Sequence, residues 1–198
     1  MREDGAKLME QPRPGLLGVW DQIVGPGMPA AEVKLVLISG FVGSGIAAWR
    51  FQTVSGSGWW ALLAALIGFD LLAGAVCNAT QTTKNWYHSR HRSLSRTMAF
   101  ILPHLGYIAL IAWLWRGTRG FDFNYFAIFS ASLLLSSFAV ILSPRRVAAP
   151  VAFAAFLFDL VLINLTVGIT PGLEWFAPGL LLKLLIGHLV PPGSECNA

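Results

Sequence analysis

Six apolar stretches, each near the length that crosses a bilayer, most constrain what this chain can fold into. They lie at roughly 33–50, 58–78, 97–115, 124–142, 147–168 and 174–190. About 20 apolar residues in helical conformation span the hydrocarbon core of a membrane. The period-two alternation of membrane barrel strands is absent, so helices are the remaining way to cross. We therefore predict an all-α integral membrane protein, a bundle of about six transmembrane helices.

The composition supports a membrane protein over a soluble domain. Charged residues make up 12% of the chain, about half the share usual in soluble domains. The pI of about 9.4 does not indicate a nucleic-acid partner, because the Lys and Arg residues flank apolar segments. The two cysteines, Cys77 in an apolar run and Cys196 in the tail, do not indicate a disulfide framework.

Three regions are expected along the chain. Residues 1–32 form a polar, cytoplasmic N-terminal arm, in which Leu16 to Val24 can form a short interfacial helix with Trp20 at the membrane surface. Residues 33–190 form the transmembrane bundle, and residues 191–198 a cytoplasmic tail. The last apolar segment is the weakest candidate for a full span, because it contains Lys183 and Pro178.

The distribution of basic residues predicts that both termini are cytoplasmic. Ten Lys and Arg residues flank the spans on the N-terminal side of the membrane and three flank them on the other, and basic residues concentrate in cytoplasmic loops. The larger set is Arg2, Lys7, Arg13, Lys34, Lys84, Arg90, Arg92, Arg96, Arg145 and Arg146, and the smaller is Arg50, Arg116 and Arg119. We expect a multi-pass protein of a bacterial cytoplasmic (inner) membrane.

The polar chemistry of the chain is concentrated between Asp70 and His104. On helical rise, Asp70 lies about 12 Å and His104 about 10 Å from the cytoplasmic end of their spans. Asn78 and His188 fall in the same half of the membrane. If the second span continues as one helix, a polar stripe follows one face of it. The stripe comprises Asp70, Gly74, Asn78, Gln81, Asn85 and His88, extended by His91. Such a stripe is typical of a cavity lining.

Three residues are candidates for catalysis: Asp70, His104 and Asn78. A carboxylate inside a membrane costs about 2.5–3.5 kcal/mol to insert and commonly marks a functional site. His104 follows Pro103, which frees a backbone carbonyl and kinks the span. The alternatives are structural: Asp70 in helix packing, Asn78 as a helix cap, and His104 as a hydrogen-bonded membrane histidine.

Four residues are candidates for substrate binding: Gln81, Lys84, Trp86 and Tyr87. Lys84 can hold an anionic headgroup, or it can extend toward lipid phosphate as an ordinary interfacial lysine. Trp86 and Tyr87 can contact the same ligand, or they can anchor the protein at the membrane surface.

Three histidines are candidate metal ligands: His88, His91 and His188. On a helix, the spacing of His88 and His91 places both rings on one face, which suits a mononuclear Zn or Fe. Alternatively, both are solvated loop residues. His104 and His188 could also ligate haem axially. With four histidines and neither an HxxxH nor an HxxHH box, the chain lacks the di-iron pattern of membrane desaturases.

Two further features of the spans predict specific helix contacts. Asp159 and Lys183 lie at similar depths on the last two spans, and we predict that they form a buried ion pair. In the first span, Gly40, Gly43 and Gly45 with Ser44 predict close helix packing. The GxxGxG pattern lacks the preceding strand of a nucleotide fingerprint.

The function that fits these features is a small membrane enzyme acting on a lipid or isoprenoid-like substrate from the cytoplasmic leaflet. Its partners would be membrane lipids and a lipophilic small molecule, with a homo- or hetero-oligomer possible in the membrane. The alternatives are a proton- or ion-coupled transporter and a non-catalytic subunit of a larger membrane complex. An inverted repeat would mark a transporter, and none is visible in the sequence.

Overall fold

Helices account for all the regular secondary structure in residues 11–56, 58–89, 94–117 and 120–192, which the computed structural model describes. Five helices are, by length and composition, able to cross a membrane, so the chain is a multi-pass membrane protein. They are α2 (Ala30–Ser55), α3 (Gly58–Ala79), the segment Leu94–Leu114, α7 (Phe123–Leu142) and α8 (Ala148–Thr166).

These five helices correspond to the first five predicted spans. The third is divided at Pro103 into α5 (Leu94–Ile101), the 3-10 turn η1 (Leu102–His104) and α6 (Leu105–Leu114). The sixth apolar segment forms α9 (Phe176–Leu181), which continues into the π-helix η2 (Leu182–His188). At 13 residues, α9 and η2 together rise only about 20 Å, less than the hydrocarbon core.

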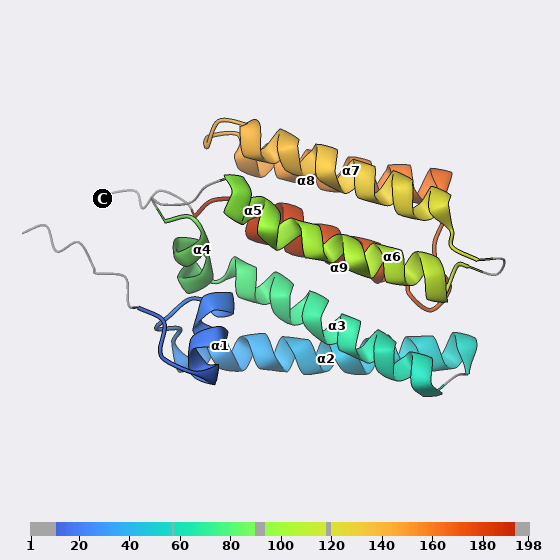
Figure 1. Cartoon of the computed structure of the whole chain (residues 1–198), viewed down its shortest axis with the longest axis horizontal. Helices are drawn as coiled ribbons and strands as arrows, with labels where there is room; N and C mark the ends of the chain where they lie inside the picture. The colour runs from blue at the N-terminus through green and yellow to red at the C-terminus, as the bar shows by residue number, and fades with distance from the viewer. Residues whose placement is uncertain (1–10, 57, 90–93, 118–119, 193–198) are drawn as a thin grey trace, which may run out of the picture.

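The shortest of these six segments lies at the centre of the molecule. In Figure 1, α9 lies behind α5 and α6, between α7 and α8 on one side and α2 and α3 on the other. Five of the seven residues of η2 are buried. Because the other helices surround this segment, the side chain of Lys183 is enclosed by protein, although α9 and η2 together are shorter than the hydrocarbon core.

Helices α2 and α3 form the most extensive helix pair in the molecule. A Cβ on Gly43 would lie 2.7 Å from the Gly68 carbonyl oxygen, and one on Gly40 would lie 2.7 Å from the Phe69 ring. Close packing at these two glycines is therefore confirmed. Gly45 does not take part, because a Cβ there would meet no atom within 4 Å.

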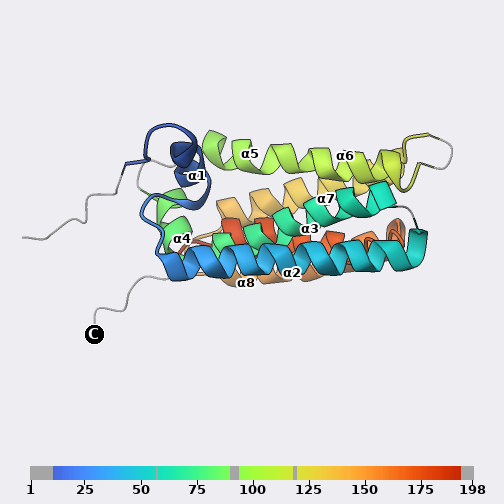
Figure 2. The same cartoon turned by 90° about the horizontal axis from the view of Figure 1, so that it is seen from below.

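The two short helices lie at one end of the bundle, here called the α1 end. There α1 (Leu16–Val24) and α4 (Gln81–Tyr87) lie near the C-terminal end of η2. The bounds of α1 match the predicted short helix. The C-terminal ends of α2 and α6 and the connection at 167–175 lie at the other end, here called the loop end (Figures 1 and 2).

Candidate functional site

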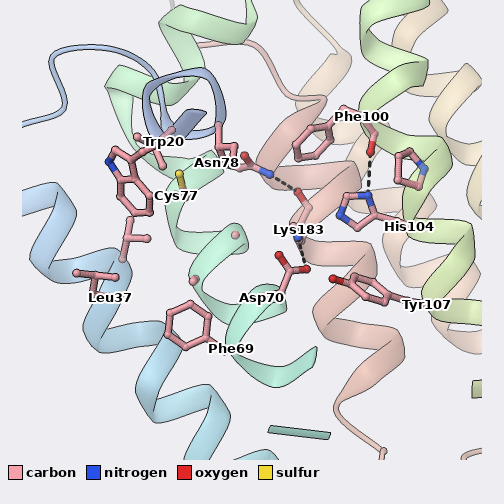
Figure 3. A pocket seen from close by; sticks show the side chains of 16 residues that line it. Trp20, Leu37, Phe69, Asp70, Cys77, Asn78, Phe100, His104, Tyr107 and Lys183 are labelled. Carbon is pink, nitrogen blue, oxygen red and sulfur yellow. Dashed lines mark hydrogen bonds and ion pairs between the residues drawn. The ribbon is translucent and has the colours of Figure 1, made fainter. Parts of the chain in front are cut away.

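A cavity of about 430 Å³ opens between the α2–α3 pair and the α5–α6 segment, with α1 beside it. Most of its lining is apolar or aromatic, and Figure 3 shows the side chains that surround it. The aromatic walls come from four elements: Trp20, Phe69, Phe100 and Tyr107. A cavity of this size and composition suits a small, largely apolar ligand.

An ion pair lies at the wall of this cavity. Lys183 Nζ donates to Asp70 Oδ2 at 2.6 Å, and the Lys183 side chain is 5% exposed whereas that of Asp70 is 40% exposed. The ammonium is thus enclosed by protein, and the carboxylate faces the cavity. A carboxylate oxygen that faces a cavity is a potential proton acceptor.

Gly74 makes this ion pair possible. A Cβ at position 74 would lie 2.9 Å from both Cδ and Nζ of Lys183. The Lys183 side chain therefore passes over α3 at Gly74, where no side chain obstructs it, and reaches Asp70, which lies four residues earlier on the same helix. Gly74, the small residue in the predicted polar stripe, thus leaves room for the side chain of Lys183 from η2.

The predicted ion pair between Asp159 and Lys183 is wrong. Asp159 is fully buried, and its Oδ1 accepts a hydrogen bond from Ser136 Oγ at 2.9 Å. Depth along the helices is compatible with either carboxylate as the partner of Lys183. The rotation of η2 about its axis turns the lysine toward α3, and depth does not determine that rotation.

Two further polar side chains reach the cavity from the α5–α6 segment. His104 Nδ1 lies 2.8 Å from the Phe100 carbonyl oxygen, and since a carbonyl can only accept, Nδ1 is the donor. In a neutral ring, Nε2 is then a proton acceptor. The Tyr107 hydroxyl points toward Asp70 in Figure 3. Asp70, Lys183, His104 and Tyr107 form what we call the cavity quartet.

Three residues of the predicted polar stripe, Asp70, Gly74 and Asn78, line the cavity, and several polar side chains of this region also bind the last helix. Asn78 Nδ2 donates to the Lys183 carbonyl at 3.1 Å, and Lys84 Nζ donates to the carbonyls of Gly187 and Val190 at 3.2 and 2.8 Å. His88 Nε2 is 2.9 Å from the His188 carbonyl oxygen. The bonds from Lys84 and His88 reach carbonyls at or just beyond the end of the π-helix, which would otherwise lack partners. The Asn78 bond instead joins α3 to the start of the π-helix.

The stripe is also not continuous, contrary to the single helix assumed for it. Helix α3 ends at Ala79, Thr80 adopts an extended conformation, and α4 begins at Gln81. Thr80 caps α4, with its side chain accepting from Thr83 N. Gln81, predicted to bind substrate, is exposed on α4 and does not line the cavity.

Trp86 and Tyr87 hold α1 against α4. Trp86 Nε1 donates to the Gln22 carbonyl at 3.2 Å, and Tyr87 Oη donates to the Gln22 and Ile23 carbonyls at 3.3 and 3.1 Å. Thr83 Oγ1 donates to the Val24 carbonyl at 2.5 Å. These residues position α1, which in turn supplies part of the cavity wall.

Burial shifts the pKa of Lys84, the charged residue of α4 that contacts the last helix. Partial enclosure lowers the pKa of Lys84 below its ordinary value, because desolvation disfavours the ammonium. The two carbonyl oxygens that it contacts offset part of this cost. At the other face of α1, hydrogen bonds from the Arg13 side chain and backbone N–H lower the pKa of Asp21 to about 2.

The candidate metal ligands are only partly described. His188 stacks on Phe100, with ring centroids 3.8 Å apart, and its ring also meets Tyr87 at 4.9 Å. Within the described ranges, no group of three or more His, Cys, Asp or Glu side chains is placed to hold a metal ion. His91 lies outside the described residues. Metal binding by these histidines stays a prediction.

Sequence reasoning overlooked three residues that shape the cavity: Tyr107, Phe100 and Trp20. Lys183 was recognised as an intramembrane charge but given the wrong partner. A signal was present for Tyr107, which lies three residues after His104 and therefore on the same face of the helix. No sequence signal distinguishes Trp20 from an ordinary interfacial tryptophan.

Comparison with protein-family models, with curated proteins and with solved structures finds no match for this chain.

Proposed function

We propose that this chain is a membrane enzyme that performs acid–base chemistry on a lipid-like substrate, with Asp70 as the proton-transfer group. One observation carries the proposal: Asp70 is an intramembrane carboxylate whose side chain is 40% exposed on an apolar cavity. A purely structural carboxylate would be enclosed with its partner, as Asp159 is with Ser136.

The roles in the cavity quartet follow from its geometry. Lys183 binds Oδ2 of Asp70 and holds the carboxylate in position to act as the base of the reaction. Asp70 would remove a proton from a substrate carbon or oxygen made acidic by an adjacent polar group. The Tyr107 hydroxyl would donate a hydrogen bond to the substrate, and His104 Nε2 would accept one.

A six-span arrangement with the α1 end in the cytoplasm belongs to the same proposal. The described polypeptide begins and finishes at the α1 end (Figure 1). Six described basic residues, Arg13, Lys34, Lys84, Arg96, Arg145 and Arg146, belong to segments at this end, and two, Arg50 and Arg116, to the loop end. This asymmetry supports an N-in/C-in orientation, with the cavity in the cytoplasmic half.

The test compares two aspartates that both lie inside the membrane. Membranes from bacteria expressing the wild type, Asp70→Asn or Asp159→Asn are extracted, and their lipids are compared by mass spectrometry. We expect a lipid species that depends on the wild type and is lost in Asp70→Asn but retained in Asp159→Asn. Treatment of the membranes with a chelator shows whether the activity also needs a metal.

Equal lipid profiles for the wild type and Asp70→Asn, at matched protein levels, would refute the catalytic proposal. A non-catalytic subunit or a transporter would then remain as the alternatives.

A further inference from the structure

A second cavity, of about 720 Å³, lies between α1 and the start of α2. We call it the interfacial chamber. Its lining includes Arg13, Asp21 and Lys34, and it shares two lining residues, Trp20 and Leu37, with the cavity that holds Asp70. The chamber and the cavity are therefore neighbours, separated by these two side chains, which lie close together in Figure 3.

The described residues that line the chamber carry a net positive charge. Two cationic side chains, Arg13 and Lys34, and one carboxylate, that of Asp21, line it. Arg13 is committed to Asp21 through a bond from Nη2 to Oδ1 at 2.6 Å and one from Nε to Oδ2 at 2.8 Å. The exposed Lys34 supplies the remaining charge, so an anionic group is the complementary ligand.

The two spaces lie at different depths. Lys34 is four residues from the start of α2 at Ala30, close to the α1 end of the bundle. Asp70 is nine residues before the end of α3 at Ala79, or about 13 Å along the helix from that end. Trp20 lies between them, and indole rings favour the boundary between headgroups and hydrocarbon.

A charged chamber at headgroup level, an apolar cavity below it and a tryptophan at the boundary match the profile of a membrane lipid. We propose that one phospholipid with a net negative headgroup occupies both spaces, its phosphate beside Lys34 and its hydrocarbon beyond Trp20, next to Asp70. This deepens the proposed function, on which it rests for the role of Asp70, by naming an anionic phospholipid as the substrate class.

The experiment measures which lipids the purified full-length chain retains. The protein is reconstituted in vesicles containing equal amounts of phosphatidylglycerol and phosphatidylcholine with identical acyl chains. It is then re-extracted in mild detergent, and the bound lipids are quantified by mass spectrometry. Lys34→Gln is compared with Arg146→Gln, which removes one exposed positive charge at the same end without touching the chamber.

We expect wild type to retain the anionic lipid preferentially, and Lys34→Gln to reduce this preference about fivefold, the effect of one basic residue near a lipid headgroup. Arg146→Gln should leave the preference unchanged. Leu37→Trp, which narrows the connection between the two spaces, should lower the total amount of retained lipid. Displacement by inorganic phosphate but not by added lipid would identify a free phosphate as the ligand instead.

No preference in the wild type, or equal effects of Lys34→Gln and Arg146→Gln, would overturn the proposal. The retained-lipid ratio of the wild type separates it from the proposed function, because lipid selection is measured here without any turnover. A chain that selects the lipid but changes no lipid in cells would refute only the chemistry.

Discussion

The two ends of the bundle use polar residues in different ways. At the loop end, Arg116 donates to Asp122 at 2.9 Å, to Thr170 at 3.1 Å and to the Val167 carbonyl at 2.5 Å, and its guanidinium lies 4.3 Å from the centroid of the Tyr125 ring. These hydrogen bonds join the segment just before α7 to the segment that follows α8. At the α1 end, Asp70 and Lys34 face cavities instead.

The pKa shifts at the loop end fit this structural role. Burial alone would raise the pKa of Asp122, but hydrogen bonds from Tyr125 N and Arg116 outweigh it and lower the pKa below its ordinary value. For Glu174, burial is likewise outweighed by the Arg50 hydrogen bond and by backbone N–H donors, including that of Gly172, so its pKa is also lowered. Both carboxylates are bound by the protein itself.

The contrast shows that a polar residue in a membrane span does not by itself mark a functional site. Asn78, Lys84 and His88 belong to the same stretch of sequence as Asp70, but their side chains hold backbone carbonyls of the last helix. Asp70 differs because its side chain is 40% exposed and lines a cavity. Variants at the two ends should therefore separate stability from ligand binding.

The largest expected effect is at the enclosed ion pair. Asp70→Leu leaves the Lys183 ammonium buried without its carboxylate, which should lower the free energy of unfolding by about 3 kcal/mol. Lys183→Met should cost less, because Asp70 is 40% exposed. The double variant should recover part of the loss, measured by thermal unfolding in detergent. Coupling of Lys183 to Asp159 instead would contradict the observed pairing.

A smaller loss is expected at the loop end. Arg116→Gln removes four hydrogen bonds and an aromatic contact, and it should lower the free energy of unfolding by about 2 kcal/mol. The retained-lipid ratio should not change. Arg50→Gln is the matched control: its ion pair with Glu174 is more exposed, so its loss should be about 0.5 kcal/mol. A changed lipid ratio in Arg116→Gln would show that the two ends are coupled.

Substitutions at two glycines test whether the ion pair beside the cavity requires the space that Gly74 leaves for Lys183. Gly74→Ala should displace Lys183 from Asp70, cost about 1–2 kcal/mol and reduce any Asp70-dependent change in lipids. Gly45→Ala meets no atom within 4 Å and should raise helix stability by up to about 1 kcal/mol. Equal unfolding temperatures for the two variants would rule out the clearance role of Gly74.

The smallest effect concerns the attachment of α1. The pKa of Asp21 in the folded protein is about 2, below the value of about 3.9 expected in the unfolded chain. Its stabilising contribution is therefore complete above pH 4 and is lost as the pH falls through 2. The difference in unfolding temperature between wild type and Asp21→Asn should be constant from pH 7 to pH 5 and shrink below pH 4. A difference that does not vary with pH would exclude this linkage.

Much of the fold could be predicted because membrane helices are encoded locally. Length and hydropathy located α2, α3, α7 and α8 to within a few residues, since a bilayer requires a continuous apolar run. The short helix α1 was predicted with its bounds. The contact between α2 and α3 was also foreseeable at Gly40 and Gly43, because small residues permit helices to approach closely.

The sequence predicts the depth of the candidate site along the helices, but not which polar residues pair with one another there. Helix rise placed Asp70 and His104 in one layer, and the structure brings both to one cavity. Depth arithmetic led to Asp159 as the partner of Lys183, which is wrong, because the sequence carries no information on how a short π-helical segment is rotated about its axis. The helix also breaks at Thr80, so Gln81 does not continue the line of polar residues on α3.

By itself, the sequence determined where helices form, because the bilayer requires about 20 apolar residues and hydrogen-bonded backbone in each crossing. It also determined which polar residues share a layer, since rise per residue is fixed. Only the tertiary structure decided which polar atoms face a cavity and which bind a neighbouring helix. That outcome depends on helix rotation and packing, which arise from contacts between segments more than 100 residues apart, such as Asp70 and Lys183.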